Sequence, residues 1–166
     1  MGSARTRANT ARDVVLGAVA VGAVIATSVL GQIAAFPNLA PRYSGLAKPA
    51  FNPPNWIFGP VWTALYALMA FASWRILRLS PSRLRIRALS LYAAMLVLNA
   101  AWSWMFFAAH SPGLGLINIL PQLALILATL DAFRRLDRLA GWILLPLAGW
   151  VAFASVLNLA IWRLNS

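Results

Sequence analysis

Cysteine is absent from this chain of 166 residues, and histidine and acidic residues are scarce. Without cysteine there is no disulfide framework, no thiolate metal site and no iron–sulfur cluster. One histidine and three aspartates also argue against a metal site built from imidazole and carboxylate ligands. We therefore predict no bound metal and no required cofactor.

The residue patterns of conventional catalysis are missing as well. The sequence offers no nucleophile with a base, no carboxylate pair and no phosphate-binding loop. No charged residue lies in the middle of an apolar run, which weighs against an ion-coupled transporter. The single histidine, His110, falls in a short connection, so an axially ligated haem of the cytochrome type is not expected.

Apolar residues are abundant: 61% of the chain is hydrophobic, 10% is charged, and eight residues are tryptophan. This composition is typical of membrane proteins. Five runs are long enough to cross roughly 30 Å of hydrocarbon, and their continuous apolar character favours helices over barrel strands. We predict an all-α integral membrane protein, a five-transmembrane-helix bundle. The predicted spans are residues 14–36, 57–79, 89–109, 114–133 and 142–162, after a basic N-terminal segment, residues 1–13.

Basic residues are unevenly distributed between the connections. Eleven of the fourteen precede the first span or lie in the second and fourth connections. The positive-inside rule then predicts a cytoplasmic N-terminus and an external C-terminus, which suits a bacterial inner membrane, with the outer membrane as the alternative. The net charge of +11 is thus explained by the orientation of the spans in the membrane. We therefore expect no nucleic acid partner. The first run is too long for the apolar core of a signal peptide.

Polar residues at membrane depth need partners or a cavity, so they seldom face lipid. Two pairs have helical i,i+4 spacing, Asn99 with Ser103 and Asn118 with Gln122, and each pair lies on one helix face. With the predicted orientation, both pairs and Asn158 fall in the outer half of the bundle. These side chains are candidate walls of a ligand pocket.

Aromatic residues accompany these amides. Trp62 and Tyr66 are one turn apart, Trp102 precedes Ser103, and Trp150, Ala154 and Asn158 form one stripe. Tryptophans can simply anchor the interface and amides can join helices. However, three of the tryptophans lie roughly 9 to 12 Å inside their spans, a depth that suits a flat apolar ligand with polar edges.

The first connection, residues 37–56, contains much of the segment "KPAFNPPNWIFGPVW" (Lys48–Trp62), in which prolines stiffen the chain. We expect it to form a lid over the pocket. The predicted lid residues are Tyr43, Pro49, Phe51, Pro53, Pro54 and Trp56. On the first span, the small-residue stripe Ala18, Gly22, Ala26 allows close helix approach, either within one copy or across a homodimer seam.

Three stretches resemble the TspO/translocator protein family, the tryptophan-rich sensory proteins once called peripheral-type benzodiazepine receptors. They are "YSGLAKPAFNPPNWIFGPVWTALY" (Tyr43–Tyr66), "LNAAWSWMFF" (Leu98–Phe107) and "LAGWVAFASVLNLAIWRLN" (Leu147–Asn165). The resemblance implies a five-helix bundle, often dimeric, with a pocket closed by the first loop. It also implies porphyrin ligands such as protoporphyrin IX, with cholesterol in the animal proteins and benzodiazepine or isoquinoline ligands.

By the same resemblance, Trp62 and Trp150 match the two pocket tryptophans implicated in light-dependent porphyrin breakdown, and would be the catalytic residues if that reaction occurs. Asn99 and Trp102 match pocket positions on the third span. Three functions follow as hypotheses. The first is a tetrapyrrole-binding sensory protein, the second is a light-dependent porphyrin-degrading enzyme, and the third is a porphyrin or lipid transporter.

The chain also departs from the family pattern. Leu159 stands where the cholesterol-recognition motif has tyrosine, although Arg163 is retained, which weighs against cholesterol binding. Trp104 occupies a position that is commonly proline, so the helix beside the pocket is expected to differ locally. Asn118 replaces an aspartate of the animal members, and any role of that charge is lost.

Overall fold

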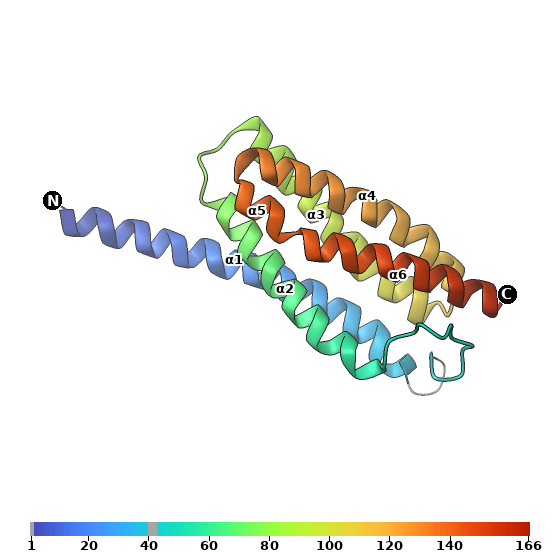
Figure 1. Ribbon diagram of the computed structural model, residues 1–166. Helices are drawn as coiled ribbons and strands as arrows, with labels where there is room; N and C mark the ends of the chain where they lie inside the picture. The colour runs from blue at the N-terminus through green and yellow to red at the C-terminus, as the bar shows by residue number, and fades with distance from the viewer. Residues whose placement is uncertain (1, 40–42) are drawn as a thin grey trace.

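The computed structural model describes the backbone of residues 2–39 and 43–166, and the side chains from residue 10 onward within these ranges. The described residues contain no strand and form five helical spans long and apolar enough to cross a membrane, which confirms the predicted fold class. Figure 1 shows the helices running side by side in a bundle. The elements are α1 (Gly2–Asn38), α2 (Asn55–Leu77), α3 (Arg83–Ser103), η2 (Trp104–Ala108), α4 (Pro112–Leu136), α5 (Arg138–Ile143) and α6 (Leu145–Leu164).

Polar caps determine where several of these helices begin. The Ser82 hydroxyl accepts a hydrogen bond from the backbone of Arg85 and starts α3, while Ser111 caps α4 in the same way. The Asp137 carboxylate accepts the N–H of Ala140 and starts α5. A capped first turn satisfies N–H groups that would otherwise lack partners. These three helices therefore begin before the apolar runs from which the spans were predicted.

Helix α1 is longer than the first predicted span. It starts at Gly2 and continues through the basic segment to Asn38, so Pro37 lies in its last turn. Figure 1 shows its N-terminal part extending beyond the other helices. The small-residue stripe Ala18, Gly22, Ala26 is exposed, and a Cβ added to Gly22 would meet no atom within 4 Å. The stripe is thus not used for packing within one copy, and the homodimer seam stays a prediction.

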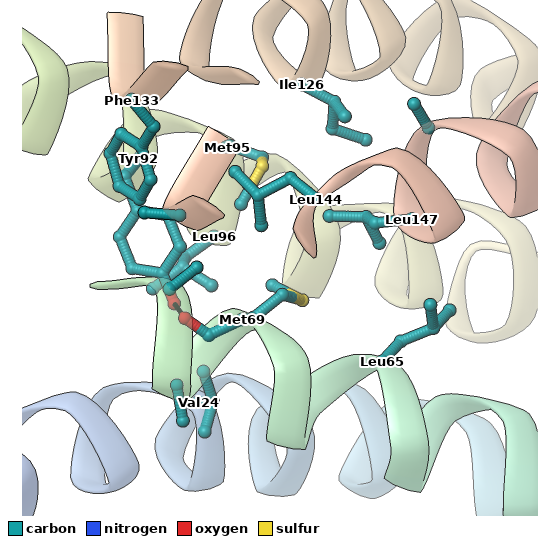
Figure 2. Close-up of a cluster of buried hydrophobic side chains, with 14 of the residues drawn as sticks. Val24, Leu65, Met69, Tyr92, Met95, Leu96, Ile126, Phe133, Leu144 and Leu147 are labelled. Carbon is teal, nitrogen blue, oxygen red and sulfur yellow. Dashed lines mark hydrogen bonds between the residues drawn. The ribbon is translucent and has the colours of Figure 1, made fainter. Parts of the chain in front are cut away.

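The two ends of the bundle differ in composition. At one end, which we call the arginine end, α2 and α4 finish and α3 and α5 begin; at the other, the lid end, α1 and α6 finish and α2 begins. The main core extends through the bundle, and Met69, Tyr92 and Phe133 are among its buried members (Figure 2). The Tyr92 hydroxyl donates to the Met69 carbonyl at 3.2 Å, and the rings of Tyr92 and Phe133 are 5.7 Å apart.

The third span ends in a π-helical turn, η2. The N–H of Ala109 donates to the Trp104 carbonyl at 2.8 Å, five residues back, and His110 then adopts a left-handed backbone with φ of 53°. This turn begins at Trp104, the residue that stands where the family commonly has proline, and the expected difference from the family's helix stays a prediction. The Trp104 indole donates to the Leu30 carbonyl at 3.0 Å and therefore joins this turn to α1.

Candidate functional site

An open apolar groove runs between the first half of α2, next to the lid, and the first half of α6. Its volume is about 600 Å³, within the range of about 300–1,000 Å³ usual for small-molecule pockets. Helix α2 packs on α1, α3 and α5, and its lid-end half leaves this space beside α6. We call it the aromatic groove; its lining residues are Pro53, Ile57, Val61, Leu65, Pro146, Gly149, Trp150 and Phe153.

Trp150 is the centre of a row of rings along this groove. Its ring centroid lies 5.8 Å from that of Phe58 on α2 and 5.7 Å from that of Phe153 one turn later on α6. Phe153 in turn meets Phe51 of the lid at 6.4 Å. Edge-on and tilted contacts of this kind stabilise aromatic clusters. The row links the lid to α6, so a flat ligand in the groove would contact the lid and Trp150 together.

Trp62 and Tyr66 form a second aromatic pair on α2. Their ring centroids are 5.4 Å apart, and both half-buried side chains pack against the main core. The Tyr66 hydroxyl donates to the Asn99 side-chain oxygen at 2.8 Å, which joins α2 to α3. Trp62 does not line the aromatic groove, although its neighbour Val61 does. The structure thus brings together two of the predicted ligand-binding residues, Tyr66 and Asn99.

Asn158 connects three helices. Its side-chain oxygen accepts from the Trp102 indole at 3.0 Å, and its amide donates to the Pro112 carbonyl at 2.7 Å. Only 2% of Asn158 is exposed, and Trp102 stacks on Phe106 at 4.9 Å. Because both ends of the Asn158 amide already have protein partners, this side chain orients Trp102 rather than offering a free polar group.

Unlike Asn158, Asn118 has a side-chain oxygen without a hydrogen-bond partner. It is 4% exposed, and its side-chain oxygen is the one buried side-chain N or O atom without a hydrogen-bond partner among residues 10–39 and 43–166. A buried acceptor left unpaired costs about 1–3 kcal/mol. Gln122, one turn further along α4, is also buried. The amide oxygen of Asn118 is therefore available to a donor on a ligand or a water molecule.

The remaining predicted residues lie away from the groove. Ser103 faces α1, where a Cβ on Gly31 would lie 3.2 Å from its hydroxyl oxygen, and Ala154 packs against the main core. Of the ten predicted ligand-binding residues, all of which the structure describes, Trp150 lines the groove. Ligand contact by any of the ten stays a prediction. The groove also contains seven residues that the sequence reasoning did not assign to the pocket wall.

A helical pattern could have found those residues. Ile57, Val61 and Leu65 recur at every fourth position of α2, and Pro146, Gly149 and Phe153 share the α6 face of Trp150. Such spacing places side chains on one face of a helix. The sequence prediction selected polar residues within the membrane spans as the pocket wall, whereas the walls of the observed groove are apolar.

The lid is fixed by a buried tyrosine. Tyr43 is 8% exposed, its ring lies 5.8 Å from that of Phe107, and its hydroxyl donates to the Asn52 side-chain oxygen at 3.2 Å. Burial raises the pKa of the Tyr43 hydroxyl, and the hydrogen bond to Asn52 offsets part of that rise. The Lys48 ammonium lies 4.7 Å from the centroid of the Tyr43 ring. Tyr43 thus acts as an anchor of the lid.

Asn165 holds the lid from the opposite side. Its side-chain oxygen accepts the N–H of Ala47 at 3.0 Å, and its amide donates to the Ala47 carbonyl, also at 3.0 Å. The other predicted lid residues are less enclosed: Phe51 is 50% exposed and Trp56 74% exposed, Pro54 is exposed, and Pro49 is half-buried. Pro53 lines the aromatic groove. Residues 40–42 of the predicted lid lie outside the described residues.

Comparison with known proteins agrees with this architecture. The family described as TspO/MBR matches residues 18–163. The chain is 40% identical over 124 residues to the tryptophan-rich protein TspO of Chlorobaculum tepidum, covering 74% of this chain and 78% of that protein. It is 37% identical over 126 residues to the human translocator protein, covering 74% of each chain.

A third relative is the tryptophan-rich sensory protein of Cereibacter sphaeroides, 37% identical over 123 residues that cover 74% of this chain and 76% of that protein. The five apolar helices and these matches identify an integral membrane protein. With its family match extending over nearly the whole helical bundle, this chain belongs to the TspO/MBR family.

Proposed function

We propose that this membrane protein binds a tetrapyrrole, protoporphyrin IX or a related ring, and acts as a sensory or regulatory protein. The observation that carries the proposal is the aromatic groove of about 600 Å³, whose wall includes Trp150 and whose edge reaches the lid. Apolar walls with aromatic faces suit a flat macrocycle. The family resemblance supplies the ligand class, and one relative is named as a sensory protein.

The residues have separate roles in this proposal. Trp150 and Phe153 offer ring faces to the macrocycle, while Phe51 of the lid covers its edge. Asn118 offers its unpaired oxygen to a donor that enters the bundle interior. Tyr66 and Trp102 are held by Asn99 and Asn158 and keep the interior walls in place.

Titration of the purified protein with protoporphyrin IX in detergent tests the proposal. The porphyrin absorption band and porphyrin fluorescence report binding without depending on the substituted tryptophans. We expect saturable binding that Trp150→Phe weakens several-fold. Trp142→Phe is the matched control, because Trp142 lies at the arginine end, 48% exposed and away from the groove. Non-saturable uptake, or equal affinity in all three proteins, would contradict the proposal.

A second candidate function is light-dependent breakdown of the bound porphyrin. It is favoured by the position of the Trp150 indole on the groove wall, where it would meet the excited macrocycle. Illumination of the complex in aerated detergent should then bleach the porphyrin faster than free porphyrin, and Trp150→Phe should slow the bleaching. A rate equal to that of free porphyrin would leave binding as the function.

We also propose that the arginine end faces the cytoplasm of a bacterium, because eleven basic residues lie before the first span or in the connections at this end. The chain lacks cysteine, so a single introduced cysteine is the only thiol that a reagent can label, and its labelling reports which side of the membrane it is on. In intact cells, a membrane-impermeant thiol reagent should label Ser166→Cys at the lid end and spare Ser82→Cys at the arginine end. The reverse pattern would show the opposite orientation.

A further inference from the structure

The arginine end contains a second cavity, distinct from the aromatic groove. It has a volume of about 470 Å³ and is lined by Arg12, Asp13, Arg75, Arg78, Leu79 and Asp137. We call it the arginine pocket. Its walls come from α1, from the end of α2 and from the turn between α4 and α5. Three guanidinium groups face two carboxylates, so the pocket carries one excess positive charge.

Two of the three arginines are fixed by ion pairs. Arg78 contacts the Asp13 carboxylate at 3.0 Å, and Arg75 contacts the Asp137 carboxylate at 2.7 Å. The Arg78 guanidinium also lies 4.5 Å from the Trp74 ring centroid, and the Trp74 indole donates to the Asp13 carbonyl at 3.1 Å. These contacts hold the pocket walls together between α1 and α2.

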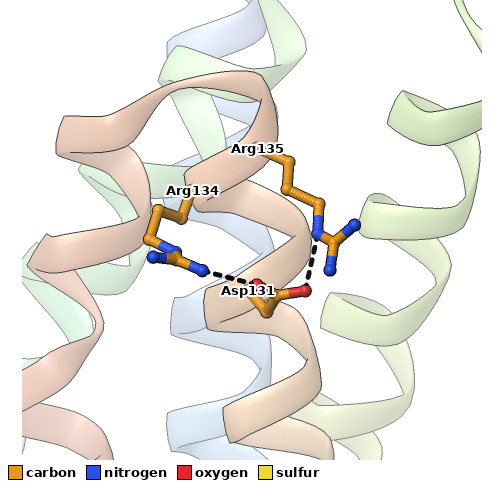
Figure 3. A network of polar contacts seen from close by, with 3 residues as sticks. All are labelled: Asp131, Arg134 and Arg135. Atoms are coloured by element: carbon orange, nitrogen blue, oxygen red, sulfur yellow. Dashed lines mark hydrogen bonds and ion pairs between the residues drawn. The ribbon is translucent and has the colours of Figure 1, made fainter.

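Arg12 is the unpaired cation of the pocket. The chain has three acidic residues, and the structure pairs each one with another arginine. The third, Asp131, accepts from Arg134 at 3.0 Å and from Arg135 at 2.7 Å, as Figure 3 shows. No carboxylate is left for Arg12, whose exposed side chain borders the cavity.

We propose that the arginine pocket binds the phosphate of an anionic phospholipid headgroup, with Arg12 as the principal contact. Guanidinium groups are well suited to phosphate oxygens, and basic pockets between membrane helices bind anionic headgroups. The pocket lies at the ends of the apolar spans, the level at which headgroups lie. Leu79 gives it an apolar edge for the glycerol region of a lipid, which a free phosphate ion would not need.

Native mass spectrometry of the purified chain in detergent tests this proposal with two probes, dioleoyl-phosphatidylglycerol and dioleoyl-phosphatidylcholine. We expect one phosphatidylglycerol to bind in preference to phosphatidylcholine. Arg12→Gln should reduce the preference about fivefold, the factor for one basic residue near a membrane surface. Arg83→Gln is the matched control, because Arg83 is exposed at the same end but does not line the pocket.

Asp13→Asn should strengthen phosphatidylglycerol binding, whereas Arg12→Gln should weaken it. The Asp13 substitution removes a negative charge and releases Arg78, so phosphatidylglycerol should bind more tightly than to the wild-type chain. An equal loss in Arg12→Gln and Arg83→Gln would overturn the proposal in favour of diffuse surface attraction. Arg12-dependent binding of inorganic phosphate, with no preference for phosphatidylglycerol over phosphatidylcholine, would overturn the assignment to a lipid. Thermal unfolding of each variant verifies that the fold is retained.

Discussion

The arginine end and the lid end of this bundle differ in their ion pairs and in the space between their helices. At the arginine end, large side chains such as Phe133 and Met69 are fully buried, and ion pairs join α1, α2 and the α4–α5 turn. At the lid end, an open groove separates α2 from α6, and Asn118 keeps a buried oxygen unpaired. Both ends thus contain buried apolar side chains, among them Phe106 and Ile161 at the lid end, but the ion pairs lie at the arginine end and the open groove lies beside the lid.

Glycine substitutions should show the largest contrast in unfolding free energy between the packed arginine end and the open aromatic groove. A Cβ on Gly141 would lie 2.5 Å from the Arg134 Cβ and 2.6 Å from the Arg134 backbone, whereas a Cβ on Gly149 would meet nothing within 4 Å. We expect Gly141→Ala to lower the free energy of unfolding by about 3 kcal/mol or more. Gly149→Ala should leave it unchanged or raise it by up to about 1 kcal/mol. Thermal unfolding in detergent measures both, and equal behaviour would contradict the contrast.

Substitution of Asp137 should have the next largest effect on the free energy of unfolding. Its side chain is 15% exposed, pairs with Arg75 and caps α5, so Asp137→Ala should cost about 2–4 kcal/mol of unfolding free energy. The control is Asp131→Ala, whose exposed pairs with Arg134 and Arg135 should contribute little. Similar losses in the two variants would mean that burial does not distinguish these ion pairs.

The same carboxylate predicts a dependence on pH. Partial burial raises the pKa of Asp137, but hydrogen bonds from Arg75 and from the backbone of Ala140 outweigh this effect, and the pKa is lowered from its ordinary value of 3.8. A lowered folded pKa contributes stability above the ordinary pKa and loses it as the pH falls through the folded value. The difference in stability between wild type and Asp137→Ala should therefore shrink in acid below about pH 4.

The sequence predicts the arginine end better than the lid end, for physical reasons. Apolar run length and arginine placement are set by the membrane, so the helices and their basic connections could be predicted directly. The ion pair of Arg75 with Asp137 joins residues 62 positions apart, and nothing in local sequence specifies it. Similarly, Ser82 and Ser111 could have indicated where the helices begin, but hydropathy alone places those boundaries inside the apolar runs.

At the lid end, the prediction identified aromatic and polar residues but not their arrangement. Helical spacing puts Asn99 and Ser103 on one face, yet Asn99 meets Tyr66 of α2 while Ser103 faces Gly31 of α1. One helix face can contact two neighbours, and spacing cannot assign them. The π-helical turn after Ser103 changes the register of the following residues, which a regular helical pattern does not anticipate.

Asn118→Leu should separate stability from function at the lid end. Replacing the amide, with its unpaired buried oxygen, by an apolar group of similar size should raise the free energy of unfolding by about 1–2 kcal/mol. Asn99→Leu, the matched control, should lower it because the Tyr66 hydroxyl loses its acceptor. If Asn118→Leu also weakens porphyrin binding, its oxygen serves the ligand. A loss of stability in Asn118→Leu would show that the oxygen has a partner, such as a bound water.

Asn165→Ala should have the smallest effect on stability, about 1 kcal/mol or less, because its hydrogen bonds to Ala47 are exposed. Its effect should instead be local. Hydrogen exchange at the Ala47 amide and its neighbours should speed up, while exchange in the main core around Tyr92 stays unchanged. Ser166→Ala is the control, since its hydroxyl bonds the Trp162 carbonyl and not the lid. Faster exchange in the core as well would mean that the lid and the arginine end unfold as one unit, and that the two ends are not energetically separate.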